Sequence, residues 1–173
     1  MRARLAGAIE RLRRAAPDVA WVAPGNLHLT LKFLGQVDEA RLAAIVAALE
    51  GAVAGVAAFD AAVVGLGAFP TAPRPRVIWA GLSEGAPALS GVAARVDAAL
   101  GALGFPPEAR PFSPHVTLGR VRVPRRAPRL ADLLGAAAGE DFGRMRVERV
   151  VLMESRLSPG GSRYSELASA RLG

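Results

Sequence analysis

The 173-residue chain contains no cysteine and only two histidines, His28 and His115. Without cysteine, the protein has no disulfide bond, no thiol nucleophile and no thiolate metal site. Its apolar residues fall in short runs, well below the roughly 18–20 residues that a membrane-spanning helix needs. We therefore expect a protein without a membrane anchor, and we predict that it is cytoplasmic.

Lysine is almost as scarce, because one lysine and twenty-one arginines supply the positive side of a formal net charge of +7. The planar guanidinium of arginine matches the geometry of phosphate oxygens, so this excess favours a polyanionic partner such as nucleic acid. The alternative is a solvated basic surface on which arginine stands in place of lysine. Charge alone does not decide between the two.

The hydrophobic pattern predicts helices and strands in a single domain over residues 1–173. The expected helices cover residues 2–16, from an N-cap at Asp38 to about Leu49, 86–103 and 130–138. Two of them have an apolar stripe, which is Leu5, Ala8, Ile9 and Leu12 in the first and Leu89, Val92, Ala93, Val96 and Leu100 in the third. The expected strands cover residues 19–22, 27–34, 58–66, 76–82, 115–123, 145–154 and 164–170, with a proline-rich turn at 69–75. Strands that follow one another in this way favour hairpins, so we predict an α+β fold.

Two segments 87 positions apart resemble each other. Residues 26–31 read Asn-Leu-His-Leu-Thr-Leu, and residues 113–118 read Ser-Pro-His-Val-Thr-Leu. Each half of the chain also carries a long helix and further strands, as a duplicated α/β unit would. We therefore predict two pseudo-symmetric lobes, with a first motif at 28–31 and a second at 115–118. Their two antiparallel sheets would face a central cleft across a pseudo-twofold axis.

Both histidines lie in the sequence His-apolar-Thr-Leu. In a strand, residues i and i+2 share a face, so we expect His28 beside Thr30 and His115 beside Thr117. Two imidazoles on opposite sides of one phosphorus would let one deprotonate water and the other protonate the oxygen that leaves a cyclic phosphodiester. The threonine hydroxyls would donate hydrogen bonds to the non-bridging oxygens. The competing interpretation is a pair of half-buried structural histidines.

This chemistry requires no metal and no cofactor, and neither motif has a carboxylate at a neighbouring position on the same face. We therefore predict that the site holds no metal. Arg120 is a candidate phosphate ligand, although an ideal strand would put it on the face opposite His115 unless a bulge intervenes. Other candidates for a basic rim are Arg76, Arg122, Arg125, Arg126 and Arg129. Candidates for stacking a base are Trp79, Phe33, Phe112 and Tyr164.

The sequence resembles the 2H phosphoesterase superfamily, and within it the RNA 2′,3′-cyclic phosphodiesterases, also called 2′-5′ RNA ligases. The likeness rests on residues 21–35 around the first motif, 75–81, 112–120 around the second motif, and 154–157 through Tyr164. Family members usually open with a short apolar strand before the first helix, whereas this chain begins in that helix.

The resemblance implies hydrolysis of a terminal 2′,3′-cyclic phosphate on RNA to a 2′-phosphate, with a reversible 2′-5′ joining activity. It also implies that His28 is the proton donor to the departing 3′-oxygen and that His115 is the proton acceptor that activates water. The expected substrate is RNA with such an end, or a small cyclic nucleotide, and the expected oligomeric state is a monomer.

Two other functions stay open. In a non-catalytic RNA-binding module, the histidines and threonines would only hold phosphate. In a serine hydrolase, Ser83 would be the nucleophile, because Gly81-Leu82-Ser83-Glu84-Gly85 matches the G-x-S-x-G pattern between a strand and a helix.

Overall fold

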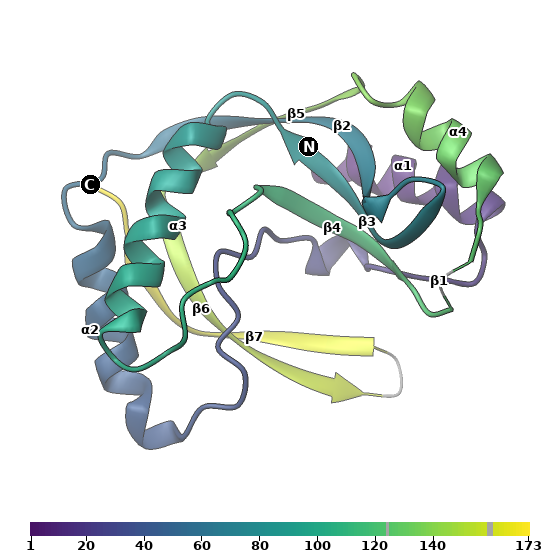
Figure 1. Cartoon of the computed structure of the whole chain (residues 1–173). Helices are drawn as coiled ribbons and strands as arrows, with labels where there is room; N and C mark the ends of the chain where they lie inside the picture. The colour runs from purple at the N-terminus through teal and green to yellow at the C-terminus, as the bar shows by residue number, and fades with distance from the viewer. Residues whose placement is uncertain (124, 159–160) are drawn as a thin grey trace. The chain divides into compact units, whose positions relative to one another are not determined.

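The computed structural model describes residues 1–123, 125–158 and 161–173 (Figure 1). The chain divides into two compact units, each assembled from three stretches of sequence. Unit 1 comprises Met1–Thr30, Ala61–Gly85 and Pro114–Met145, and unit 2 comprises Leu31–Asp60, Ala86–Ser113 and Arg146–Gly173. In the described part of the chain, no helix is both long enough and apolar enough to cross a membrane.

Unit 1 is built on a five-stranded sheet with the strand order β1-β4-β3-β2-β5. The strands are β1 (Val19–Trp21), β2 (Phe59–Thr71), β3 (Arg74–Leu82), β4 (His115–Val121) and β5 (Asp141–Val147). Strand β4 pairs antiparallel with β1 on one side and with β3 on the other, and β3 pairs antiparallel with β2. The second motif therefore has β3 on one side, whereas on the other side β1 reaches only Gly119–Val121 of β4.

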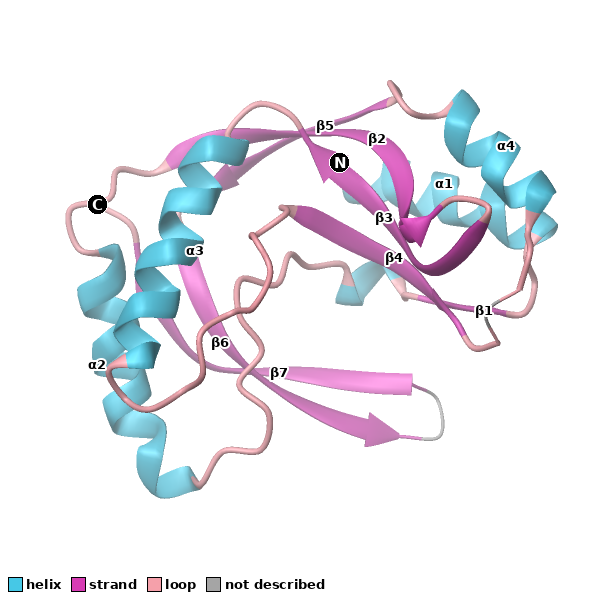
Figure 2. Cartoon of the chain, viewed as in Figure 1, coloured by secondary structure: helices cyan, strands magenta, loops and turns pink. Residues whose placement is uncertain are grey.

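One face of this sheet, which we call the core face, packs against two helices of unit 1. They are α1 (Arg2–Ala15) and α4 (Pro128–Ala136), which lie side by side (Figure 2). The helix α1 buries the apolar stripe Leu5, Ala8, Ile9 and Leu12, as the sequence predicts. Burial of each large apolar side chain here contributes about 1.5–3 kcal/mol to the free energy of unfolding. The sheet contributes Val63, Leu66, Ile78, Ala80, Val116, Leu118 and Phe142 to the same core.

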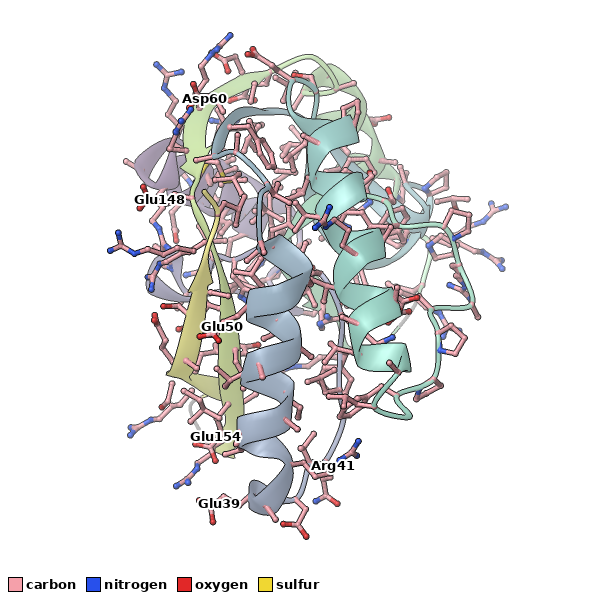
Figure 3. The ribbon with its side chains drawn as sticks, turned by 90° about the vertical axis from the view of Figure 1, so that its left-hand side faces the viewer. Glu39, Arg41, Glu50, Asp60, Glu148 and Glu154 are labelled. Atoms are coloured by element: carbon pink, nitrogen blue, oxygen red, sulfur yellow. The ribbon has the colours of Figure 1, made fainter. Side chains whose placement is uncertain are left out.

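Unit 2 combines two helices with a two-stranded antiparallel sheet. The helices are α2 (Leu42–Val53) and α3 (Ala86–Gly101), and the strands are β6 (Arg149–Ser158) and β7 (Gly161–Arg171). Figure 3 shows α2 beside α3 and next to the two strands. Their apolar faces form a second core, which includes Ile45, Leu49, Val92, Val96, Leu100, Val150, Leu152 and Ala170.

Local signals explain where the helices of unit 2 begin and how they meet. Asp38 accepts a hydrogen bond from the Ala40 N–H (2.9 Å) and so caps the short 3-10 turn Glu39–Arg41 that leads into α2. Arg41, labelled in Figure 3, donates from Nη2 to the Leu103 carbonyl oxygen (2.6 Å). Its guanidinium also lies 4.4 Å from the centroid of the Phe105 ring. The start of α2 is thereby attached to the segment that follows α3.

The single lysine of the chain makes an ion pair inside unit 2. The Lys32 side chain is only 3% exposed, and its Nζ donates to Asp97 of α3 and to the Pro106 carbonyl oxygen (2.7 Å). The hydrogen bond from Lys32 holds the pKa of Asp97 below its ordinary value of 3.8, and the charge of Lys32 and the Glu108 N–H act in the same direction against the effect of burial. Because a buried ammonium needs a partner, this pair attaches the segment after the first motif to α3.

The α+β fold with antiparallel sheets is confirmed, but three sequence predictions of elements were wrong. Residues 27–34 do not form a strand: Leu29 makes one isolated bridge, and the chain then leaves unit 1 after Thr30. The turn expected at residues 69–75 is shorter, because β2 continues to Thr71 and β3 begins at Arg74. The strand expected at 145–154 is two strands, β5 and β6. The pseudo-twofold relation and the central cleft stay predictions.

Replacing Asp97 with Asn tests the ion pair. A carboxyl whose pKa is lowered by folding stabilises the folded state above its unfolded pKa, and this contribution is lost as the pH falls through the folded pKa. We therefore expect Asp97→Asn to lower the free energy of unfolding at about pH 7, and the difference from wild type to shrink at about pH 3. Urea unfolding at both pH values measures this difference in the free energy of unfolding. Glu50→Gln, on the exposed side of α2, is the control that removes the same charge.

Candidate functional site

The two His-x-Thr sequences meet in unit 1 through one antiparallel bridge, in which Leu29 pairs with Val116 of β4. The strand β1 occupies this side of β4 as far as Trp21, and the Val22 N–H donates to the Leu118 carbonyl oxygen (2.8 Å). The chain then makes a 3-10 turn at Pro24–Asn26 before it returns to β4. Residues distant in sequence are thus neighbours on one strand edge.

The register of this bridge determines which side chains face each other. One step to either side of the Leu29–Val116 pair, His28 lies opposite Thr117 and Thr30 lies opposite His115. In a regular ladder, directly opposite residues have Cβ atoms about 4.5–5.5 Å apart, and residues in the diagonal relation of His28 to His115 are about 7–8 Å apart. Val116 points into the core, so these four side chains share the other face of the sheet, which we call the histidine face.

A backbone contact determines the orientation of His28. Its Nδ1 lies 2.7 Å from the Asn26 carbonyl oxygen. Because a carbonyl oxygen only accepts, the hydrogen of this contact lies on Nδ1. Asn26 is the last residue of the 3-10 turn and lies two residues before the exposed His28. The turn therefore directs the Asn26 carbonyl group toward the imidazole. Asn26 belongs to the first motif, but the role of its carbonyl group is not predictable from the residue type, because any residue at this position carries the same group.

His115 contacts the ring of Phe69, a residue for which the sequence predicts a turn. The His115 and Phe69 ring centroids are 5.2 Å apart at an interplanar angle of 81°. Phe69 in turn lies 5.2 Å from the Trp79 ring, tilted by 37°. Trp79 pairs with Thr117 in the sheet, and Gly81 pairs with His115. The aromatic residues therefore belong to the histidine face, and a longer β2 in the prediction would have included Phe69.

Arg120 also lies on the histidine face, because β4 contains a bulge. Thr117 pairs with Trp79 but Gly119 pairs with Ile78, so two steps on β4 correspond to one step on β3. Arg120 consequently pairs with Val77, which shares the face of Trp79, and its side chain is exposed. Arg76 is exposed and lies where the register of β2 and β3 shifts, because Phe69 pairs with Val77 but Pro70 pairs with Pro75, so strand alternation does not assign its side chain to either face.

The remaining candidates are spread over both units. Tyr164 lies on β7 in unit 2, opposite Ser155, and Phe33 and Phe112 also belong to unit 2. Phe33 is 78% exposed, so its ring is not part of the core of unit 2. Four basic candidates are exposed in unit 1, and one of them, Arg125, pairs with Asp18 (2.8 Å). These four are Arg122, Arg125, Arg126 and Arg129.

Ser83 lacks the backbone geometry of a nucleophile elbow. That motif holds its serine in a strained turn after a strand of a parallel sheet. None of the described residues other than glycine has a positive φ, and β3 has antiparallel neighbours. The Ser83 N–H continues the sheet pattern by donating to the Ala62 carbonyl oxygen (3.0 Å). The structure therefore gives the serine hydrolase alternative no support.

Among the described residues, no group of three or more His, Cys, Asp or Glu side chains lies close enough together to hold a metal ion. The chemistry offered by the histidine face is that of two imidazoles, two hydroxyl groups and one guanidinium. These are groups that transfer protons and bind phosphate oxygens.

Comparisons with known proteins agree on one family. The model of the 2′-5′ RNA ligase superfamily matches residues 2–158. A Methanothermobacter thermautotrophicus protein named RNA 2′,3′-cyclic phosphodiesterase is 36% identical over 163 residues, which are 94% of this chain and 88% of the relative. A crystal structure from Thermus thermophilus is 33% identical with a TM-score of 0.77 and covers 99% of this chain and 91% of its own. Escherichia coli LigT in complex with 3′-AMP is 25% identical with a TM-score of 0.74 and covers 98% and 92%.

Replacing Gly67 with Ala tests how tightly the histidine face is packed. A Cβ at Gly67 would overlap the indole ring of Trp79, so the ring must move. We expect a loss of about 1–3 kcal/mol in the free energy of unfolding, the usual effect of overpacking. Gly91→Ala in α3 is the control, because its Cβ meets no atom within 4 Å and alanine favours a helix. Thermal and urea denaturation compare the two, and equal effects would contradict the packing argument.

Proposed function

The chain belongs to the 2′-5′ RNA ligase superfamily, and on this basis we propose that it hydrolyses the terminal 2′,3′-cyclic phosphate of RNA to a 2′-phosphate. The observation that carries the proposal is the Leu29–Val116 bridge, which sets both His-x-Thr sequences on one face of unit 1. The name of the Methanothermobacter relative and the nucleotide bound to LigT support this substrate class.

In the proposed reaction His115 takes a proton from water, and the water oxygen attacks phosphorus. The bond from phosphorus to the 3′-oxygen breaks in line with the attack, and His28 donates a proton to that oxygen through Nε2. The Nδ1 contact with the Asn26 carbonyl oxygen suits this role, because it orients the ring and is kept in the protonated form. The 2′-oxygen keeps the phosphoryl group. Both imidazoles then exchange their protons with solvent.

The other groups of the histidine face stabilise the negative charge of the phosphate groups. The hydroxyl groups of Thr30 and Thr117 donate hydrogen bonds to the non-bridging oxygens, where negative charge builds up as water attacks. Arg120 lies farther along β4, on the same face, and is placed to contact a phosphate of the RNA backbone. Roles for Arg76 and Tyr164 in substrate binding stay predictions from the sequence, as do the cytoplasmic location and the monomeric state.

The 2′-5′ joining activity would break the same bond as hydrolysis, with a different attacking group. When a 5′-hydroxyl group of a second RNA end attacks in place of water, the bond to the 3′-oxygen again breaks, and a 2′-5′ linkage is the product. The same two imidazoles serve as acceptor and donor of the proton. A non-catalytic RNA-binding module would use the same face without consuming the cyclic phosphate.

Incubation of the protein with RNA that ends in a 2′,3′-cyclic phosphate, in the presence of EDTA, tests the proposed reaction. We expect complete hydrolysis to a 2′-phosphate, since none of the proposed steps involves a metal. The position of the phosphate is read by chromatography against 2′- and 3′-phosphate standards. A 3′-phosphate would contradict the assignment of the leaving oxygen, and an intact cyclic end would favour the binding module.

Replacing either histidine with alanine tests their roles. We expect His28→Ala and His115→Ala each to lower turnover by about 10²–10⁴-fold, because each removes one proton-transfer step, while RNA affinity stays near that of wild type. Single-turnover kinetics and RNA binding titrations measure the two effects separately. Ser83→Ala is the matched control, and we expect it to leave turnover unchanged. Loss of activity in this variant alone would instead support a serine nucleophile.

A further inference from the structure

Three rings on the histidine face form a continuous stack that ends on His115. Trp79 contacts Phe69 with 5.2 Å between ring centroids, and Phe69 contacts His115 at the same separation. The Phe69–His115 contact is nearly perpendicular, at 81°. Separations of about 4.5–7 Å and a T-shaped arrangement are those that aromatic pairs prefer. All three residues belong to unit 1.

The base of the stack is determined by two glycines. The indole of Trp79 lies over Gly67, where any Cβ would overlap it, and a Cβ at Gly81 would lie 3.2 Å from the ring and 3.1 Å from the Val64 carbonyl oxygen. Gly67 pairs with Trp79 and Gly81 pairs with His115, so both glycines are part of the local sheet. The absence of side chains at both positions therefore lets the indole ring lie directly on the backbone of the sheet.

The Trp79 ring is held by packing and not by a polar contact. Its buried Nε1–H has no hydrogen-bond partner in the described part of the chain, although buried N–H groups normally find one. A buried donor without a partner disfavours the folded state, so packing of the ring must outweigh this loss. The ring supports Phe69, and Phe69 is the ring that meets the imidazole.

We propose that Phe69 is a positioning residue that fixes the orientation of the His115 ring for proton transfer. The inference rests on the proposed function, in which His115 accepts the proton of the attacking water. His28 is oriented by the Asn26 carbonyl group, and Phe69 acts on His115 from a different strand, β2. Phe69 contacts no reacting atom in this role. It restricts the rotation of an imidazole that is only half-buried.

Phe69→Leu is the decisive variant, because leucine keeps apolar bulk but removes the ring. Displacement of a catalytic group by about 1 Å lowers rates by up to about 10²-fold, so we expect kcat to fall by about 10- to 100-fold. KM should change by less than about threefold, since the phosphate-binding groups are intact. Phe142→Leu is the matched control: Phe142 is fully buried in the core of the same unit. It should lose stability but keep its kcat when measured below its unfolding transition.

A second readout does not depend on activity. The chain has only two histidines, so the imidazole proton resonances of His115 can be assigned by comparison with His28→Ala. A ring at 5.2 Å shifts these resonances, and we expect Phe69→Leu to move those of His115 and leave those of His28 in place. In Phe142→Leu, both should stay in place.

The outcomes separate this inference from the proposed function. Unmoved His115 resonances, a kcat within about twofold of wild type, or an equal fall in kcat for both leucine variants would overturn the role of Phe69. A wild-type protein that leaves the cyclic phosphate intact would overturn the proposed function. In that case, the resonances would still show whether the Phe69 ring contacts His115.

Discussion

One antiparallel bridge, between Leu29 and Val116, is the constraint on which the candidate site depends. It makes neighbours of two short sequences that the chain places 87 positions apart. The β4 side of the bridge is fixed in place, because β1 and β3 pair with the edges of β4, and Val116 and Leu118 are buried in the core of unit 1. Burial of the apolar side chains on the core face thus fixes the backbone that positions the polar groups on the histidine face.

The two histidines have different neighbours. His28 follows a 3-10 turn and is held by a backbone carbonyl group, which is directional and polar. His115 opens a regular strand and contacts an aromatic ring whose own support is a tryptophan over two glycines. A bulge at Leu118 and Gly119 adds Arg120 to the same face. Small departures from ideal strand geometry therefore decide which groups can act on one phosphate.

Much of the fold and part of the site were readable from the sequence. The helix stripes, the Asp38 cap and the matched His-x-Thr pair follow from local periodicity and residue type, which need no tertiary information. The strand expected at residues 27–34 failed for a tertiary reason: β4 begins at His115, and Pro114 before it has no N–H to continue the ladder. Phe69 was assigned to a turn because prolines surround it, and the face of Arg120 depends on a bulge that alternation cannot reveal.

The interleaving of the two units has a consequence for how the protein is made. Each unit draws on early, middle and late stretches of the chain, and its core includes residues from all three. Unit 1 lacks Phe142, and unit 2 lacks Leu172, until the third stretch of each unit has been synthesised. Neither core can close before its third stretch has been synthesised, so cooperative closure of each unit is the final step of its folding. Such non-local contacts also make that final step slow compared with helical proteins of this size.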